Sequence, residues 1–452
     1  MRELFKKIPN VNNLIHNISE KIMIDNDYLL KESINEELTS LRQTILQQEI
    51  TDFDTEQLEQ KIIDLYQQKN KHKHQKCINA TGVIIHTNLG RSCLSAKQLE
   101  NIDVLTSYNN LEFDLETTKR GSRYDLVEDV ISKVCLSESA LVVNNNAAAV
   151  MLVFNEFGKN KEVIVSNSEL VEIGGSFRIP EIMKLSQANL KSVGTTNKTK
   201  LSDYIQALNE NTGLVVKVHQ SNFYMEGFTA NVSAKELVDY RKENNLDYII
   251  YEDLASGSLY DLSKLGLDKE PTVQDSVLDG VDIISFSGDK LLGSIQAGII
   301  IGKKEYISRL KKNQLLRVLR PSGMILNIIE STFRIYLNEQ NALENIPVLK
   351  YLSEDLSLVK ERAKYLEDKL KDKFNVEVIA TKAAVGGGCM PRSKIDSFGV
   401  SINELNVEKL KNYLMNLTIP IITIINEEKL IIDCKLLNYE EMDYVVKNIK
   451  FY

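Results

Sequence analysis

The chain has 452 residues, of which 43% are hydrophobic and 26% charged, and its formal net charge is −8. This length accommodates two or three domains around a large buried core. No run approaches the roughly twenty apolar residues of a membrane span, and residues 1–10 carry charges where a secretory signal is apolar. Net acidity disfavours nucleic-acid binding driven by overall charge alone. We therefore expect a cytoplasmic protein with no membrane contact.

The cysteines are scattered along the chain without paired spacing and without a neighbouring histidine in a metal-ligand pattern. They are Cys77, Cys93, Cys135, Cys389 and Cys434. Reduced thiols and the absence of a metal site are the expectation from this pattern.

Residues 1–75 are polar, with apolar residues at helical spacing such as Leu38, Leu41 and Ile45. This pattern predicts a small helical domain followed by a linker. The stretch 69–76 is basic and is either a solvated linker or a contact for an anionic backbone.

Residues 76–337 alternate short apolar runs with helical patterns. The expected strands are 140–143, 162–166, 214–218, 248–251, 283–286 and 298–301. Such alternation predicts βαβ units, and hence an α/β domain with a mostly parallel sheet covered on both faces. We expect this to be the catalytic domain.

Residues 338–452 have a different pattern, with a long amphipathic helix at 352–370. Strands are expected near 376–380, 398–402, 421–425 and 430–432. We interpret this part as a small α+β domain.

Lys290 is the most informative residue, because it lies in a turn between a strand-like run, 281–287, and small residues. A lysine there can form a Schiff base with a carbonyl cofactor, of which pyridoxal 5'-phosphate is the usual one. Upstream, Asp253 follows the apolar run 248–251, where a carboxylate can protonate the cofactor's ring nitrogen. Ser287, at the end of the run 281–287, is a further cofactor-binding candidate. The alternative for Lys290 is an ordinary surface lysine.

Asn145, Asn146 and Ala147 lie where an apolar strand is followed by a helical run. Free N–H groups at such a junction, helped by the helix dipole, can bind the phosphate of a cofactor. An ordinary asparagine cap of the helix is the alternative.

Other polar loops also follow expected strands, at the sheet edge where α/β proteins bind ligands. One is 172–180, another contains Thr195 and Thr196, and a third contains His219 and Asn222. Structural turns explain the first two nearly as well, and His219 could either face the cofactor or form a hydrogen bond in the core.

Three arginines are candidate anion ligands. Arg91 follows a short apolar strand with polar tips, while Arg317 and Arg320 are spaced to share one face of a helix. Together they could bind a tetrahedral dianion. Solvation or ion pairing of Arg317 and Arg320 is the alternative.

Taken together, these motifs resemble the bacterial L-seryl-tRNA(Sec) selenium transferases, or selenocysteine synthases. The similarity runs in order through nearly the whole chain, and its motifs are 8–11, 78–82, 86–91, 144–149, 174–180, 194–197, 287–293 and 296–298. The resemblance implies a fold-type I pyridoxal phosphate enzyme that forms a large homo-oligomeric ring, typically a decamer. It also implies that the N-terminal domain grips the selenocysteine tRNA.

By this resemblance Lys290 carries the cofactor, Asp289 lies beside it in the active site, and Arg91, Arg317 and Arg320 bind selenophosphate. The implied reaction converts seryl-tRNA(Sec) to selenocysteinyl-tRNA(Sec) by β-elimination of water and addition of selenium to an aminoacrylyl intermediate. Thr195, Thr196 and Asn222 are further substrate-binding candidates.

Two other functions compete with this one. The first is a pyridoxal phosphate lyase acting on a small amino acid or amino sugar phosphate, against which the helical N-terminal domain and the arginine pair argue. The second is a noncatalytic module that holds seryl-tRNA, which the absence of Lys290 would have suggested.

Overall fold

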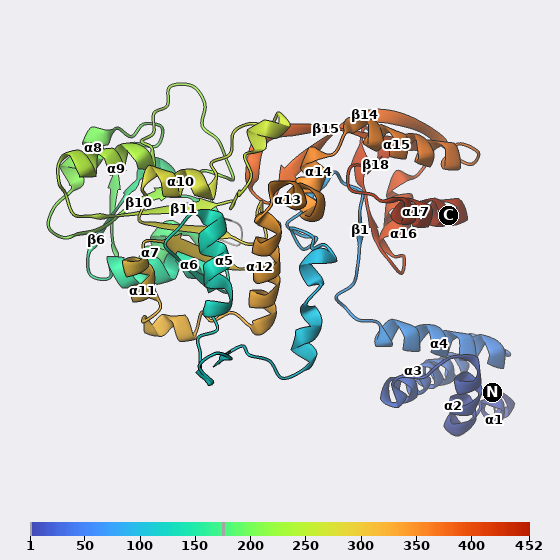
Figure 1. The fold of residues 1–452 in the computed structure, drawn as a ribbon. Helices are drawn as coiled ribbons and strands as arrows, with labels where there is room; N and C mark the ends of the chain where they lie inside the picture. Colours follow the sequence, from blue (N-terminus) through green and yellow to red (C-terminus); the bar gives the residue numbers. More distant parts are fainter. Residues whose placement is uncertain (1, 174–176) are drawn as a thin grey trace. The chain divides into compact units, whose positions relative to one another are not determined.

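The computed structural model describes residues 2–173 and 177–452 (Figure 1). It divides into two compact units, Met1–Lys76 and Cys77–Tyr452, which are described separately below. The boundary expected near residue 337 falls inside the second unit, and the three-part division stays a prediction.

The first unit is helical, as its apolar spacing predicts. Its helices are α1 (Arg2–Lys7), α2 (Val11–Lys21), α3 (Asp27–Leu46) and α4 (Thr55–Asn70). The side chains of Asn10, Asn26 and Asp54 cap the last three of these at their N-termini. Their apolar faces meet in one core, which includes Leu38 and Ile62.

The second unit contains a seven-stranded sheet. In spatial order its strands are β5 (Ser139–Val143), β13 (Gly298–Gly302), β12 (Ile283–Ser287), β11 (Ile249–Ala255), β10 (Thr212–Val218), β6 (Glu162–Ser166) and β9 (Asn189–Val193). All neighbours pair in parallel except β13, which runs antiparallel to both β5 and β12. The predicted strands and the mostly parallel sheet are confirmed.

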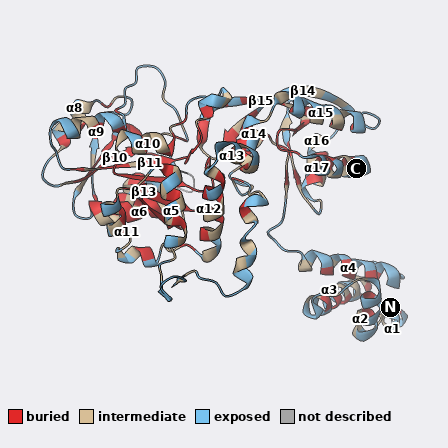
Figure 2. Ribbon diagram, viewed as in Figure 1, coloured by how far each residue is buried: buried red, intermediate tan, exposed pale blue. Residues whose placement is uncertain are grey.

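Helices cover both faces of this sheet (Figure 1). One face packs against α5 (Asp125–Cys135), α8 (Leu201–Ala207), α9 (Ala234–Glu243), α10 (Val273–Asp279) and α12 (Gly323–Tyr336). The other packs against α6 (Asn146–Val153), α7 (Ile179–Leu185) and α11 (Lys304–Leu310). Successive strand residues point to opposite faces, so that Val142 lies in the first core and Val143 in the second. The strands are consequently buried almost throughout, except for the edge strand β9, which is mostly exposed (Figure 2).

The same unit contains a five-stranded sheet. Its order is β17 (Ile424–Asn426), β18 (Lys429–Asp433), β15 (Cys389–Asn403), β14 (Asn375–Gly386) and β2 (Val83–Ile85). Its core includes residues of α15 (Leu356–Leu370), α16 (Val407–Met415) and α17 (Tyr439–Phe451). Strand β2 pairs with β14 in parallel. The segment 86–92, which follows β2, thereby starts from this smaller sheet.

Shorter elements complete the unit. They include β1 (Ile78–Asn79) with β16 (Ile421–Ile422), the pairs β3 (Phe113–Asp114) with β4 (Lys119–Arg120) and β7 (Glu172–Ile173) with β8 (Phe177–Arg178), and helices α13 (Glu339–Asn345) and α14 (Pro347–Ser353). Among the described residues, no helix combines the length and apolar character needed to cross a membrane.

Candidate active site

The polar candidates gather at the carboxyl edge of the seven-stranded sheet. Residues 144–147 follow β5, His219 follows β10, Asp253 lies near the end of β11, and the turn 288–290 follows β12. Because β5, β10, β11 and β12 all point the same way, these segments meet at one edge. Parallel α/β sheets bind ligands at this edge.

Lys290 is only 8% exposed, and its main chain is fixed on both sides. Its carbonyl accepts hydrogen bonds from Ser92 Oγ at 2.6 Å and from the Gly293 N–H at 2.9 Å. Within the described residues the Lys290 ammonium has neither a hydrogen-bond partner nor an ion-pair partner. A buried, positioned amine of this kind is available to bond a carbonyl cofactor.

Asp253 is 1% exposed, and its two carboxylate oxygens differ. Oδ1 accepts from Asn146 Nδ2 at 2.8 Å and from the Ala255 N–H at 3.0 Å. Oδ2 is buried and has no hydrogen-bond partner in the described part of the chain. A buried polar atom without a partner is costly, so this oxygen indicates a missing donor. The ring N–H of pyridoxal phosphate is a donor of the right kind, and the residues present fit that cofactor.

Burial raises the pKa of Asp253 above its ordinary value, against the lowering effects of the Asn146 hydrogen bond, the Ala255 N–H and the Lys290 and His219 charges. Desolvation disfavours the charged carboxylate. A protonated ring nitrogen beside Oδ2 would favour ionisation, so cofactor and carboxylate would stabilise one another's charges.

His219 hydrogen-bonds on two sides. Its main-chain N–H donates to the Asp253 carbonyl at 2.9 Å, and its Nε2 lies 3.1 Å from Glu270 Oε1. Burial lowers the pKa of His219, but the hydrogen bond and charge of Glu270 outweigh this effect and leave it raised. Ser256 also donates to the same Glu270 oxygen. His219 therefore lies at the site and is held by a buried acid.

The strand-to-helix junction divides into two parts. Asn145 caps α6 by accepting from the Ala148 N–H at 2.9 Å, as the capping alternative predicts. Asn146 instead binds Asp253, and its own Oδ1 is buried and unpaired within the described residues. Ala147 lies in the first turn of α6 and is partly exposed, so its main-chain N–H is in a position to bind an anion.

Arg91 and Asp289 form an ion pair beside Lys290. Arg91 Nη1 lies 2.7 Å from Asp289 Oδ2, and Ser92 donates to the Asp289 carbonyl. Arg91 has the left-handed backbone angle φ +63° and is 40% exposed, whereas the Asp289 carboxylate is buried. Segment 86–92 thus joins the catalytic turn from the smaller sheet. Ser287, which ends β12, is buried next to this turn.

The prediction that one helix carries both Arg317 and Arg320 is wrong. A short 3₁₀ helix, Gln314–Arg317, ends at the first arginine, and Arg320 lies in irregular backbone. The Leu319 carbonyl instead accepts from the Asn144 N–H at 3.1 Å, and Pro321 disfavours helical geometry at Arg320. The segment therefore lies against the strand-to-helix junction.

The two arginine side chains also differ in their surroundings. Arg317 is exposed, while Arg320 Nη1 lies 3.2 Å from Glu112 Oε1, an acid that Arg123 also binds. In the described residues no hydrogen bond or ion pair joins either one to Arg91. A shared anion site for all three stays a prediction.

The remaining substrate-binding candidates, Thr195, Thr196 and Asn222, are exposed. Thr195 and Thr196 are exposed beyond the edge strand β9, and Thr195 Oγ1 bonds the Lys198 main chain as in a local turn. Asn222 is exposed and donates to the Glu172 carbonyl at 3.1 Å. In the loop 172–180, residues 174–176 lie outside the described residues.

Sequence reasoning missed three contributors. Ser92 orients the Lys290 turn, Glu270 holds His219, and the tip of the β14–β15 hairpin approaches Asn222, since a Cβ built on Gly388 would lie 3.2 Å from Asn222 Cβ. Ser92 directly follows the motif 86–91 without belonging to it, and Glu270 follows no strand. No local signal identifies any of them.

A buried free lysine and a buried half-paired carboxylate at the same edge of a parallel sheet are features of a pyridoxal phosphate enzyme of fold-type I. A family described as L-seryl-tRNA selenium transferase matches residues 77–438. The chain belongs to this family. The expected family, enzyme class, fold class and cofactor are confirmed.

Full-length relatives agree. An L-seryl-tRNA(Sec) selenium transferase of Clostridium botulinum (strain Loch Maree / Type A3) is 43% identical over 99% of this chain and 98% of its own length. One from Clostridium perfringens (strain ATCC 13124) is 44% identical with the same coverage. A solved D-glucosaminate-6-phosphate ammonia-lyase has a TM-score of 0.59 at 16% identity, covers 86% of this chain and 97% of its own, and shows the fold alone.

Proposed function

We propose that this chain converts seryl-tRNA(Sec) to selenocysteinyl-tRNA(Sec) with selenophosphate as the selenium donor. The observation that carries the proposal is the arrangement of Lys290 and Asp253, a free buried amine and an unpaired buried oxygen at one sheet edge. Membership in the transferase family supports the choice of substrate.

The cofactor would supply an electron sink for the carbanion that forms when the seryl α-proton leaves. Lys290 would hold it and, once displaced by the seryl amine, would take that proton. Asp253 would keep the ring nitrogen protonated, and Asn146 would fix the Asp253 carboxylate through its 2.8 Å bond. His219 and Ser287 would border the ring.

The main-chain N–H groups at Asn145, Asn146 and Ala147 would bind the cofactor phosphate at the N-terminus of α6. The Asn145 side chain, as a cap, would contribute by fixing this turn. With this assignment the cofactor phosphate and the selenophosphate would bind at different places, the first at the α6 N-terminus and the second at the arginines.

Arg91 would bind selenophosphate with Arg317 and Arg320, while Asp289 holds the Arg91 guanidinium 2.7 Å away. Charge from arginines would offset the phosphate charge as selenium leaves it. Thr195, Thr196 and Asn222 would contact the substrate at the outer rim. Loss of selenium transfer with retained tRNA binding in Arg91→Ala would support the anion role.

We also propose that the chain works in the cytoplasm, where aminoacyl-tRNAs are found, and as a ring-shaped oligomer, a decamer by resemblance. Exposed apolar side chains around residues 105–115 support self-association, among them Leu105, Phe113 and Leu115. In the first unit, candidate tRNA contacts include Lys6 and Lys7. In the structure Lys6 forms an ion pair with Glu3, and Lys7 with Asp52.

The test is a single-turnover assay with purified seryl-tRNA(Sec), labelled selenophosphate and the cofactor-loaded enzyme, with ordinary seryl-tRNA as the control. We expect label on the first tRNA only. Absence of transfer by an enzyme with intact cofactor absorbance, together with release of water or ammonia from a small amino acid or amino sugar phosphate, would favour the lyase instead.

A further inference from the structure

A cavity of about 340 Å³ lies against the candidate active site and has no role in the proposal above. It is enclosed by the loop 219–224 after β10, by residues 268–270, and by the β14–β15 hairpin tip at 390–393. His219 belongs both to its wall and to the Asp253 cluster, through the 2.9 Å bond from the His219 N–H to the Asp253 carbonyl. The cavity therefore opens beside the reacting groups.

The hairpin tip is a second link to the catalytic lysine. Burial raises the pKa of the Cys389 thiol to about 12, while the Lys290 charge acts in the opposite direction. Leu291, the residue after Lys290, belongs to the same apolar core as Cys389 and Met390, so the hairpin tip lies beside the lysine turn. The smaller sheet thus contributes one wall of a cavity at the edge of the larger sheet.

The rim of the cavity combines an aromatic ring with a cation. The Arg392 guanidinium carbon lies 5.0 Å from the centre of the Tyr224 ring, and Tyr224 is 53% exposed. No carboxylate pairs with Arg392 among the described residues. Phe223 and the buried Met390 add apolar surface beside this pair. An exposed ring stacked with a guanidinium is suited to hold a nucleobase.

The acids of the cavity are already bonded. Glu270 accepts from His219 and Ser256, and Asp268 accepts from Ser393 Oγ at 2.8 Å. Lys269 is exposed, with the Asp275 carboxylate at the ion-pair limit of 4.0 Å. Asp268 is exposed like Lys269 and Arg392, and a hydroxyl donor leaves its charge in place, so the rim presents two cations beside one carboxylate.

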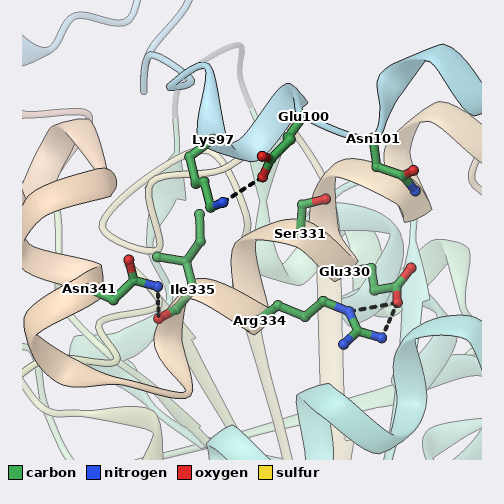
Figure 3. Close-up of a pocket in the computed structure, with 8 residues that line it drawn as sticks. All are labelled: Lys97, Glu100, Asn101, Glu330, Ser331, Arg334, Ile335 and Asn341. Atoms are coloured by element: carbon green, nitrogen blue, oxygen red, sulfur yellow. Dashed lines mark hydrogen bonds and ion pairs between the residues drawn. The ribbon is translucent and has the colours of Figure 1, made fainter.

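A larger cavity elsewhere in this unit has the opposite character. It measures about 530 Å³ and is lined by residues of α12, by residues of the segment 97–101 and by Asn341 of α13 (Figure 3). Its charges neutralise one another, since Lys97 pairs with Glu100 at 2.6 Å and Arg334 with Glu330 at 2.8 Å. It has no aromatic side chain in its wall. The larger volume therefore does not make this cavity the better candidate for a nucleotide, because its described lining residues lack an aromatic ring and an unpaired cation.

In an aminoacyl-tRNA the amino acid is esterified to the ribose of the last nucleotide, in an unpaired strand. When the seryl amine reaches Lys290, that nucleotide must lie next to the site. Unpaired bases are bound by stacking on aromatic rings and guanidinium planes, and their phosphates by cations.

We propose that the 340 Å³ cavity binds the unpaired 3′-terminal nucleotides of the aminoacyl-tRNA, with a base stacked on Tyr224 and Arg392 and a phosphate near Lys269. This inference rests on the function proposed above. It assigns the hairpin tip a role in presenting the seryl group to Lys290.

The test uses the full-length, cofactor-loaded enzyme and its Tyr224→Ala, Tyr224→Phe, Arg392→Ala and Arg392→Gln variants, with Arg334→Ala as the matched control. Single-turnover selenium transfer is measured against seryl-tRNA(Sec) concentration. Loss of one stacking contact should raise the half-saturating concentration about 5–150-fold for the two alanine variants and Arg392→Gln. Tyr224→Phe and Arg334→Ala should behave as wild type.

Binding of the uncharged tRNA(Sec), intact or shortened by its three terminal nucleotides, separates this cavity from other tRNA contacts. Wild type should bind the intact tRNA more tightly, and the alanine variants should lose that difference while keeping the visible cofactor absorbance. Equal half-saturation in wild type and variants, or a shift that follows lost cofactor absorbance, overturns the cavity proposal. Failure of wild type to transfer selenium at all overturns the proposed function instead.

Discussion

Asp282 and Asp253 are buried acids at opposite edges of the same sheet. Asp282 precedes β12 at the amino edge, and both of its oxygens are bonded: Arg241 binds both, Lys303 Nζ lies 2.6 Å from Oδ1, and the Ile250 N–H donates to Oδ2 at 2.8 Å. Asp253, at the carboxyl edge, keeps Oδ2 without a partner among the described residues.

Burial alone therefore does not distinguish a structural acid from a functional one. The two are 0% and 1% exposed, yet Asp253 Oδ2 lacks a partner in the described residues and both Asp282 oxygens are bonded. A buried acid with all its lone pairs satisfied stabilises the fold, while one left half-paired is prepared for a ligand. The following predictions test that distinction.

Removal of one lysine at each edge of the sheet should give the largest contrast. Lys290→Ala is expected to abolish selenium transfer and the visible absorbance of bound cofactor, because no other amine would form the Schiff base. Lys303→Ala, at the amino edge, should keep both. Absorbance spectra and single-turnover assays measure this, and turnover retained by Lys290→Ala would remove the lysine from the mechanism.

Asp282→Ala should cost stability rather than chemistry. It leaves the Arg241 guanidinium, whose side chain is only 11% exposed, without its acid, and breaking a buried pair costs about 3–5 kcal/mol. Urea unfolding at fixed protein concentration measures the loss. The exposed acid of the Asp368–Lys371 pair gives a control, for which Asp368→Ala should leave the urea midpoint close to that of wild type. Equal losses in both variants would contradict the structural role of Asp282.

Asp253→Asn should have the reverse profile, with impaired chemistry and an intact fold. Losing a hydrogen bond to a charged group costs about 1.5–3 kcal/mol, or roughly 10–150-fold in turnover. The amide is neutral, so the apoprotein should be at least as stable as wild type. Turnover numbers and urea midpoints measured together decide the outcome, and a destabilised variant with normal turnover would reverse the assignment of the two edges.

The stability of the cofactor-free protein should depend on Asp253 ionisation. Burial holds the folded-state pKa of Asp253 above its ordinary value of 3.8, so the folded state keeps a proton that the unfolded state has lost. The stabilising contribution is complete below pH 3.8 and is lost as the pH rises through the folded-state pKa. Wild type should therefore lose stability relative to Asp253→Asn as the pH increases, and parallel urea curves at every pH would contradict this.

The sheet strands were predictable because uninterrupted apolar runs such as 163–165 are bounded by polar residues and become buried strands. The β14–β15 hairpin was predicted only as two short strands. Its middle carries polar cross-strand pairs such as Lys382 with Asp396, which have no apolar pattern and depend on the opposite strand.

The candidate site divides in the same way. Lys290 and Asp253 were identifiable because Lys290 closely follows the apolar strand β12 and Asp253 lies near the end of the apolar strand β11. The bonds from Ser92 to Lys290 and from Arg91 to Asp289 join residues 198 apart, and no local pattern reports them. Asn146 was expected at the phosphate, but its amide binds Asp253, since side-chain direction at a helix start depends on the neighbouring strand.

Glu112, a third acid, is 32% exposed at the rim and should have the smallest effect. Its hydrogen bond to Arg123 is the main cause of its lowered pKa. Burial acts in the opposite direction, and the charges of Arg123, Arg320 and Arg120 lower the pKa further. Glu112→Gln should cost about 0.2–1 kcal/mol near neutral pH, because exposed ion pairs contribute little. A lowered pKa means that this contribution disappears as the pH falls through the folded-state value. Urea midpoints at neutral and acidic pH measure it, and a loss as large as that of Asp282→Ala would show that partner number, rather than burial, sets the cost of removing an acid.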